Sequence, residues 1–365
     1  FGYEQVDLGA TTGDDDGPDS GVGTSNGGVE VIPLTALAPT QVSTGNFVNR
    51  RAAVTWDGMG YGIAYEDPVS GDIKFLRTDQ DGLPLTTPVS VSEGVSGTNP
   101  DLVFANDEYG IAWKFGGAAR FRRVSSDGTL LGSTYESTST GINTTSLPPR
   151  VSSNGSDYAL VFAITIASTY SLNYSIIDGS TGTAEPESVS VGATYSAAAP
   201  RWNGSQWLTV TRNTAADQVQ ARTFLDEWST SSRLDTEAGS ASSGFLVPAA
   251  SGYAALWQEP GTIDNNFHFR SLDTTGSPTS TPVHVAPIEG SSGSLEAAKR
   301  TARGIEVWVA RGATHDRYLL DDSGTVLDSQ TIAPPNTGFL DRLGAEFTYV
   351  YTDGEGLWLQ RFESL

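Results

Sequence analysis

The chain of 365 residues contains no cysteine, one methionine and only three histidines. Without cysteine there is neither a disulfide framework nor a thiolate metal site. The three histidines, His268, His284 and His315, are widely spaced along the sequence, which argues against a zinc or iron centre. No apolar run approaches the eighteen residues that a membrane-spanning helix requires, so the sequence predicts no membrane span.

Positive charge is scarce as well. Lysine and arginine total 21 against 43 aspartate and glutamate residues, which gives a formal net charge of −22. A field of this sign repels phosphate backbones and anionic lipid surfaces. We therefore expect no nucleic-acid partner. The same charge favours solubility and tolerates bound cations.

The first 29 residues form an acidic, glycine-rich leader without hydrophobic periodicity. Such a segment buries too little apolar area to offset its ordering entropy, so we expect a flexible tether, or a tail that reaches a neighbouring subunit. Asp14, Asp16 and Asp19 are weak calcium candidates, although no bidentate acid follows at the spacing of a calcium loop. Calcium is the one cofactor that the sequence leaves open, and no other is expected.

Short turns recur along the chain, and each precedes a run that usually opens with an aromatic residue. The turns come every 40 to 52 residues: Asp57-Gly58, Asn106-Asp107, Asn154-Gly155, Asn203-Gly204, Ser251-Gly252, Arg303-Gly304 and Leu343-Gly344. The residues that open the runs are Tyr61, Tyr109, Tyr158, Trp207, Tyr253, Ile305 and Phe347. Asn-Gly and Asp-Gly between two alternating runs predict β-hairpins in which both central residues need a positive φ.

Each run, such as YGIAY (61–65), places every second residue on one face, which predicts a buried apolar row. A third strand is expected at 72–77, 119–124, 266–272 and 315–320. A fourth strand has the form LPLTTPVSV (83–91) or SPTSTPVHV (277–285), and its prolines fit an outer edge. Four short strands about every 48 residues, seven times over, predict an all-β, seven-bladed β-propeller with four antiparallel strands per blade.

The propeller is expected to span residues 30–365, with blades that begin near residues 51, 101, 150, 201, 249, 296 and 341. The seventh repeat stops after its third strand. VIPLTALAPTQV (31–42) has the character of a fourth strand, so residues 30–42 are predicted to complete the last blade. Closure of this kind removes two exposed sheet edges that would otherwise favour aggregation.

The repeats resemble the blades of seven-bladed propellers in secreted or lipid-anchored bacterial proteins, which carry a W-[ND]-G-x-x-[YW] phrase. Here the phrase reads WDGMGY (56–61) and WNGSQW (202–207), and the resemblance covers residues 30–365. It implies the fold and little about activity, because propellers host binding scaffolds, hydrolases and lyases alike. The leader looks like the tether of a surface lipoprotein, although no cysteine is present to carry a lipid. The resemblance thus implies export to a bacterial cell surface, the periplasm or the extracellular space.

In a propeller, the blade-to-blade connections and the turns between second and third strands open on one face around the central channel. The first candidate site residues lie where the innermost strands begin: Arg51, Asp101, Arg150, Arg201 and Arg342. They would form either a guanidinium cluster for a carboxylate or sulfate ligand, or ion pairs between blades. Bacterial sialidases use an arginine triad of the first kind. Their S-x-D-x-G-x-T-W box is not matched, because SSDGT (125–129) and DDSGT (321–325) lack its spacing and its tryptophan.

A second candidate set follows the second strands: Glu66, Asp67, Lys114, Arg212, Glu259 and Asp353. The four carboxylates include candidates for the paired acids of glycoside chemistry. Such a pair needs one carboxyl whose pKa is raised by burial or by a neighbouring charge, and the sequence does not locate that environment. The alternative is that these residues lie in solvated loops.

Most of the eight tryptophans are expected to fill the wedge between blades rather than to stack on sugars. The predicted core positions are Trp56, Trp113, Trp207, Trp257 and Trp308. Trp228 and Trp358 fall outside this row, and Trp228 is a candidate for an exposed position.

The sequence favours a non-catalytic, exported binding or assembly module that recognises a protein or glycan through its inter-blade loops. Two alternatives stay open. The first is a carbohydrate-active enzyme, sialidase-like or lyase-like, at the channel mouth. The second is a subunit of a surface filament or multi-protein complex, held through residues 1–29.

Overall fold

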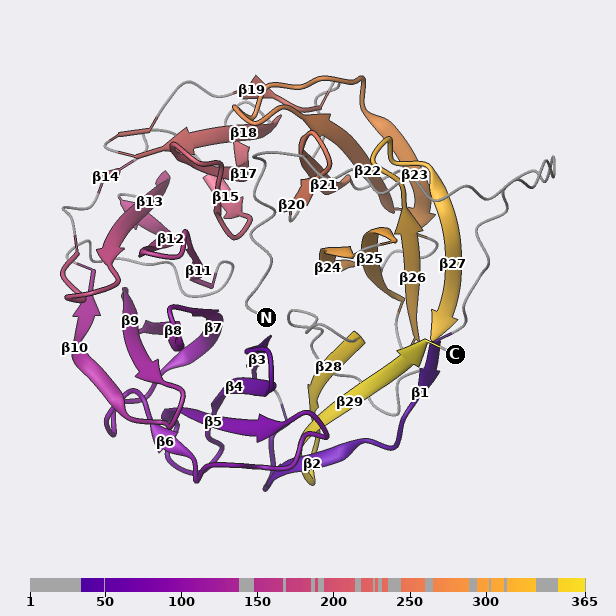
Figure 1. The fold of residues 1–365 in the computed structure, drawn as a ribbon. Coiled ribbons are helices and arrows are strands. Elements are labelled where there is room, and N and C mark those ends of the chain that lie inside the picture. Colours follow the sequence, from indigo (N-terminus) through magenta and orange to yellow (C-terminus); the bar gives the residue numbers. More distant parts are fainter. Residues whose placement is uncertain are drawn as a thin grey trace, which may run out of the picture.

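The computed structural model describes residues 34–48, 50–137, 148–166, 169–184, 188–189, 194–213, 218–225, 227–228, 232–235, 244–259, 265–288, 294–301, 303–311, 314–332 and 347–364. Within these residues all regular structure is β-strand. The strands form seven antiparallel blades around a common axis, a seven-bladed β-propeller as the sequence predicts. Figure 1 shows the ring along this axis, with first strands nearest the centre and outer strands at the rim.

The first three blades are built in chain order. Blade 1 has β3 (Ala52–Trp56), β4 (Gly60–Glu66), β5 (Ile73–Asp79) and β6 (Val89–Ser90). Blade 2 has β7 (Thr98–Ala105), β8 (Glu108–Phe115), β9 (Ala118–Ser125) and β10 (Leu130–Glu136). Blade 3 has β11 (Arg150–Ser153), β12 (Asp157–Ile166), β13 (Thr169–Asp178) and β14 (Ser188–Val189).

The next three blades follow the same plan, with one split strand. Blade 4 has β15 (Thr194–Ala197) and β16 (Arg201–Trp202), which both pair with β17 (Trp207–Asn213), and then β18 (Gln218–Phe224) and β19 (Ser232–Arg233). Blade 5 has β20 (Gly244–Ala249), β21 (Gly252–Glu259), β22 (Asn265–Leu272) and β23 (Val283–Ile288). Blade 6 has β24 (Ser294–Thr301), β25 (Gly304–Arg311), β26 (Thr314–Leu320) and β27 (Val326–Ile332).

Blade 7 closes the ring with strands from both ends of the chain. β28 (Phe347–Thr352) pairs with β29 (Gly356–Ser364), and β29 pairs on its other side with β1 (Leu34–Ala36) and β2 (Thr40–Thr44). Leu34 lies opposite Ser364 and Thr40 opposite Leu359. The leading segment therefore supplies the outer strand of the last blade, as predicted. The first strand expected near residue 341 lies outside the described residues.

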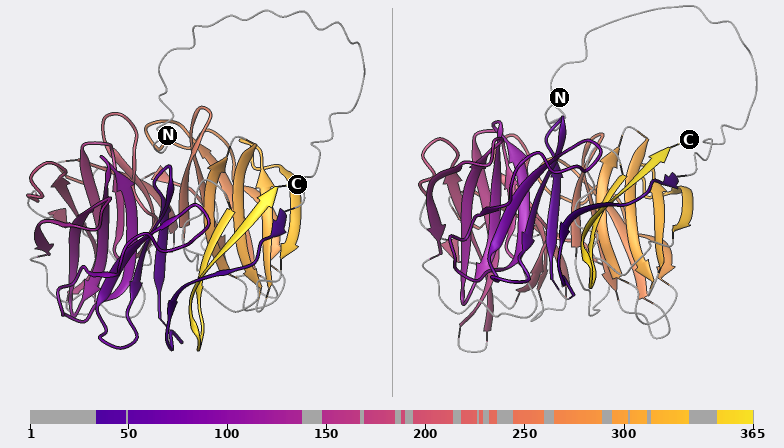
Figure 2. Two further views of the ribbon diagram at one scale, coloured as in Figure 1. Left: turned by 60° about the horizontal axis from the view of Figure 1, so that its bottom comes forward. Right: turned by 90° about the horizontal axis from the view of Figure 1, so that it is seen from below.

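Because neighbouring strands are antiparallel, the turns of a blade alternate between the two faces of the ring, which Figure 2 shows from the side. We call the face with the second-to-third turns and the blade-to-blade connections the connection face. The opposite face, with the first-to-second and third-to-fourth turns, is the hairpin face.

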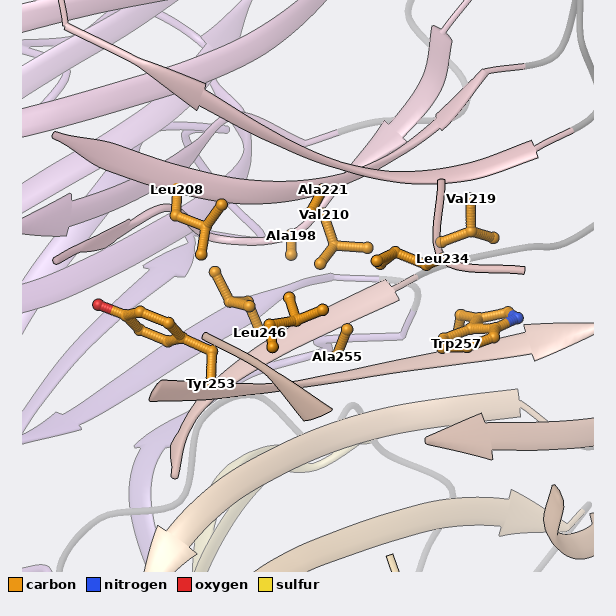
Figure 3. Close-up of a cluster of buried hydrophobic side chains, with 11 residues drawn as sticks. Ala198, Leu208, Val210, Val219, Ala221, Leu234, Leu246, Tyr253, Ala255 and Trp257 are labelled. Atoms are coloured by element: carbon orange, nitrogen blue, oxygen red, sulfur yellow. The ribbon is translucent and has the colours of Figure 1, made fainter. Parts of the chain in front are cut away.

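The hydrophobic core is divided among the junctions between blades. Figure 3 shows the junction of blades 4 and 5, where Leu208 and Val210 of β17 face Leu246, Tyr253 and Trp257 of blade 5. Fully buried rings of this kind fill the wedge between two flat sheets, so each junction is a separate small core.

The tryptophans confirm most of the sequence prediction. Trp113, Trp207 and Trp257 are completely buried and Trp308 almost so, whereas Trp56 is only partly buried. Trp228 is not exposed: it is half-buried and packs edge-on against Tyr174, with ring centroids 5.1 Å apart. The sequence around Trp228 is polar, and only the fold brings this ring to the aromatic cluster of blades 3 and 4.

Two local expectations were wrong. In the Asp57, Asn154 and Asn203 turns only the glycine has a positive φ, because the Asp or Asn side chain instead accepts backbone N–H groups of its own turn. In the expected fourth strands, regular pairing starts only at Val89 and Val283, after the prolines. The proline stretches make isolated bridges at Pro84 and Pro278, since proline has no N–H to continue a ladder.

Candidate functional site

Of the residues predicted from the starts of the first strands, Asp101 and Arg150 tie blade 2 to blade 3. Asp101 is completely buried, and its carboxylate accepts the Val151 N–H at 2.8 Å. Arg150, the first residue of β11, places Nη1 3.9 Å from Asp101 Oδ1. This pair serves the contact between adjacent blades.

Arg201 is the first residue of β16, and its guanidinium spans three blades. Nε donates to the carbonyl of Leu246 in blade 5 at 3.3 Å, and Nη1 donates to Ser152 Oγ in blade 3 at 3.4 Å. Arg51 is exposed just before β3, and its carbonyl accepts the Glu66 N–H at 3.0 Å. Arg342 lies outside the described residues. The described arginines thus belong to different junctions.

The second set brings acid and base together where blades 1 and 2 meet on the connection face. Glu66, at the end of β4, is buried, and its Oε1 accepts the Asn99 N–H of blade 2 at 2.7 Å. Arg50 Nη1 lies 3.9 Å from Glu66 Oε2. Lys114, at the end of β8, is also buried and interacts electrostatically with Glu66. We call Arg50, Arg51, Glu66 and Lys114 the junction group.

Burial shifts both titrating members of the junction group toward their neutral forms. It raises the pKa of Glu66 above its ordinary value, against the opposing effects of the Asn99 N–H, Arg50 and Arg51. It lowers the pKa of Lys114, against the attraction of Glu66. Arg50, Arg51 and Lys114 all interact electrostatically with Glu66, so the group brings three basic side chains to one buried carboxylate on a strongly acidic chain.

The remaining candidates have separate local partners. Asp67 accepts the Ser70 N–H and hydroxyl and lies 3.2 Å from Lys74 Nζ. Glu259 accepts the Trp257 indole N–H at 2.7 Å. His268 Nε2 also lies 3.4 Å from Glu259. Asp353 accepts the N–H groups of Glu355 and Gly356. Arg212 is half-buried in β17, where it pairs with Ser196. These carboxylates are used within their own turns and strands.

The sequence did not predict a hydrogen-bonded group of an acid, an arginine and a tyrosine that joins neighbouring blades on the hairpin face. Asp57 of blade 1 accepts hydrogen bonds from Arg77 Nε and from the Tyr109 hydroxyl of blade 2, the latter at 2.6 Å. The next junction repeats it with Glu108, Arg123 and Tyr158. The recurring tyrosine at the start of the second strands was the available signal, but it was interpreted only as apolar core.

Among the described residues no group of three or more His, Cys, Asp or Glu side chains is arranged to hold a metal ion. The calcium candidates Asp14, Asp16 and Asp19 lie outside these residues, so the calcium prediction stays a prediction. The described residues also include no helix with the length and apolar character that a membrane crossing requires.

No family model matches the chain, and no curated protein matches it either. Its likeness to solved structures defines the class as the β-propeller domains. The propeller domain of the trilobed protease from Pyrococcus furiosus, described as an open velcro topology, has a TM-score of 0.51 and 9% identity over 84% of this chain and 95% of that chain. A candidate 6-phosphogluconolactonase from Bacteroides uniformis has a TM-score of 0.51 and 14% identity over 77% of this chain and 87% of that chain.

The acylaminoacyl peptidase of Pyrococcus horikoshii also has a TM-score of 0.51, at 10% identity over 85% of this chain and 52% of that chain. This chain thus spans about half the length of that peptidase. At such identities the likeness shows the fold alone. The propeller neighbours include protease domains and a lactonase-like protein, and their activities belong to those proteins.

Proposed function

We propose that the chain is a non-catalytic, exported binding module whose connection face recognises an acidic glycan or an acidic peptide. The junction group carries the proposal. Arg51 is exposed and Arg50 is about one-third exposed, with 35% of its side-chain surface accessible, so both arginines are accessible to a ligand. Guanidinium groups provide planar paired donors that suit carboxylate and sulfate ligands.

The hydrogen bonds of the candidate carboxylates support binding over catalysis. A glycosidase needs two carboxyls that face one substrate, with one carboxyl held protonated. Of the carboxylates predicted from the sequence, Glu66 and Asp101 each accept a backbone N–H from the next blade, and Asp67 and Asp353 cap their own turns. These contacts give the carboxylates roles in the fold.

The proposal is tested with an array of sulfated, carboxylated and neutral oligosaccharides, with each bound compound also analysed for cleavage products. We expect binding to the anionic members, without products. The double variant Arg50→Glu, Arg51→Glu is expected to weaken this binding at least about 10-fold, as for the loss of charge-assisted contacts. Arg303→Glu, in the β24–β25 turn on the hairpin face, is a control for charge reversal on the other face and should bind like the parent.

Equal losses in both variants would show that only the overall charge matters. Cleavage products from the parent protein would replace the proposal with the enzyme alternative, in which Glu66 is the first residue to test. Absence of binding to every anionic oligosaccharide and to a polyglutamate peptide would overturn the recognition of acidic ligands.

A further inference from the structure

One buried position of the repeat holds a carboxylate in blade 6 and a neutral residue in the other six blades. The second residue of the second strand, counted from the residue that opens it, faces the next blade: Gly62, Gly110, Ala159, Leu208, Ala254, Glu306 and Thr348. The space is tight where it can be measured, because a Cβ on Gly62 would lie 2.2 Å from the Tyr109 ring and one on Gly110 2.6 Å from the Tyr158 ring. Six blades have a neutral residue here, so the fold does not require the carboxylate of Glu306.

Glu306 is completely buried in a small network of charges. Its Oε1 accepts the Trp308 indole N–H at 2.9 Å and the Arg317 Nε–H at 2.8 Å. Arg317 is itself 1% exposed and also donates to Asp328 Oδ2 at 3.3 Å. Glu306 Oε2 is buried and has no hydrogen-bond partner within the described part of the chain. Apolar residues often replace buried ion networks without loss of stability. We therefore expect this network to have a role other than stability.

Lys299 lies directly opposite Glu306 in the pairing of β24 with β25. β24 is the innermost strand of blade 6, beside the axis of the ring (Figure 1), and Lys299 remains partly exposed. Burial of the amine lowers the pKa of Lys299 to about 8, although the negative charge of Glu306 opposes this shift. Burial also raises the pKa of Glu306, although Arg317 opposes the shift. The oxygen left to hold a proton is Oε2, because Oε1 already accepts two hydrogen bonds.

We propose that Lys299 and Glu306 form a carbonyl-binding site in which the Lys299 amine forms an imine with a small neutral aldehyde. The Nζ lone pair attacks the carbonyl carbon, the new C–N bond forms, and a proton passes from nitrogen to oxygen to give a carbinolamine. The C–O bond then breaks as the nitrogen lone pair forms C=N, and the leaving hydroxyl takes the Glu306 proton and departs as water. The iminium nitrogen returns a proton to Glu306, so one aldehyde and one amine give one imine and one water.

The charge of the surroundings favours a neutral aldehyde. Arg317 is shared between Glu306 and Asp328, so it does not supply a cation for an anionic substituent. The net charge of −22 also disfavours anionic compounds. Because Glu306 is completely buried, we restrict the proposal to a small aldehyde. This site is independent of the junction group, which lies between blades 1 and 2.

The chain contains only three lysines, Lys74, Lys114 and Lys299, which makes the test direct. The whole protein is treated with glycolaldehyde and sodium cyanoborohydride at pH 7, and the rate of modification of each lysine is followed by peptide mass spectrometry. Lys299 is expected to react at least about 10-fold faster than Lys74, whose ammonium is held 3.2 Å from Asp67. A rate for Lys299 at or below that of Lys74 would overturn the proposal.

The variant Glu306→Gln separates proton donation from a purely electrostatic effect. If Glu306 only stabilises the ammonium, its removal leaves more free amine and the rate at Lys299 rises, which contradicts its proposed role. If Glu306 supplies the proton, the rate falls at least about 10-fold. Should this variant fail to fold, the pH profile of the parent protein decides. Half-maximal reactivity of Lys299 near pH 8 supports the site, and a midpoint at the ordinary lysine value of about 10.4 overturns it.

Discussion

Trp257 shows how much a single residue contributes to one blade junction. Its ring is completely buried, stacks on His268 with centroids 5.5 Å apart, and donates its N–H to Glu259. Replacement by alanine is expected to lower the free energy of unfolding by about 3–5 kcal/mol, because it leaves a large cavity and an unpaired acceptor. Urea unfolding measures this loss. Trp56→Ala, at a partly buried ring, should cost clearly less; equal losses would contradict the assigned burial.

Asp57 makes stability depend on pH. Burial tends to raise the pKa of Asp57, but hydrogen bonds from Arg77, Tyr109 and two backbone N–H groups outweigh it, and the net pKa is lowered. The ionised carboxylate therefore stabilises the fold fully above the ordinary value of about 3.9, and this contribution is lost as the pH falls through the lowered value. Asp57→Asn should cost about 2 kcal/mol at pH 7 and progressively less as the pH falls below the ordinary aspartate value. A difference in unfolding free energy that does not change with pH would refute this assignment.

At the scale of the strands, β1 and β2 hold the ring closed. Their pairing with β29 covers the edge of the last blade, and the Thr40 hydroxyl donates to the Asp81 carbonyl of blade 1 at 3.0 Å. Deletion of residues 30–44 should expose this edge and produce aggregation, measured by light scattering and size-exclusion chromatography. A variant that lacks only residues 1–29 is the control, and it should stay as stable as the parent. A monomeric, equally stable 30–44 deletion would contradict the role of β1 and β2.

The turn between β5 and β6 packs against this closing strand. Gly82 has φ +85°, and a Cβ there would lie 2.7 Å from Leu359 Cδ2 and 3.3 Å from Thr40 Cβ. Gly94 has nearly the same φ, +82°, with no atom within 4 Å of its Cβ position. Both alanine variants should lose about 1 kcal/mol from the backbone, and Gly82→Ala about 1–3 kcal/mol more from overpacking. Equal unfolding midpoints would show that the turn does not press on blade 7.

For the whole molecule, the 43 acidic residues outnumber the 21 basic ones, which predicts that the thermal stability depends on salt concentration. Like charges repel one another more strongly in the compact state, and added salt screens this repulsion. The thermal unfolding midpoint should therefore rise between 20 mM and 500 mM sodium chloride. A midpoint that falls would mean that attractive surface pairs such as Arg120 with Glu136 outweigh the net charge.

The fold could be predicted because it depends on local, repeated signals. Asn203-Gly204 followed by Trp207 defines a hairpin and its buried face within a few residues, and seven copies fix the ring. The roles of the candidate site residues depend on partners about 50 residues away. Asp101 accepts the Val151 N–H only because adjacent blades align at that height. Lys299 becomes unusual because the fold buries much of it in β24, opposite Glu306, and the sequence-based alignment of the blades did not place this pair.

The pairing of Leu34 with Ser364 has a consequence for biosynthesis. The strand made first must wait for a partner that leaves the ribosome about 330 residues later, which takes on the order of 20–60 seconds at typical elongation rates. Six blades can fold during this interval, but the pairing of β1 and β2 with β29 cannot form until β29 has been made. Any helper protein that protects the nascent chain would have most to gain by covering residues 34–44 until β29 has left the ribosome.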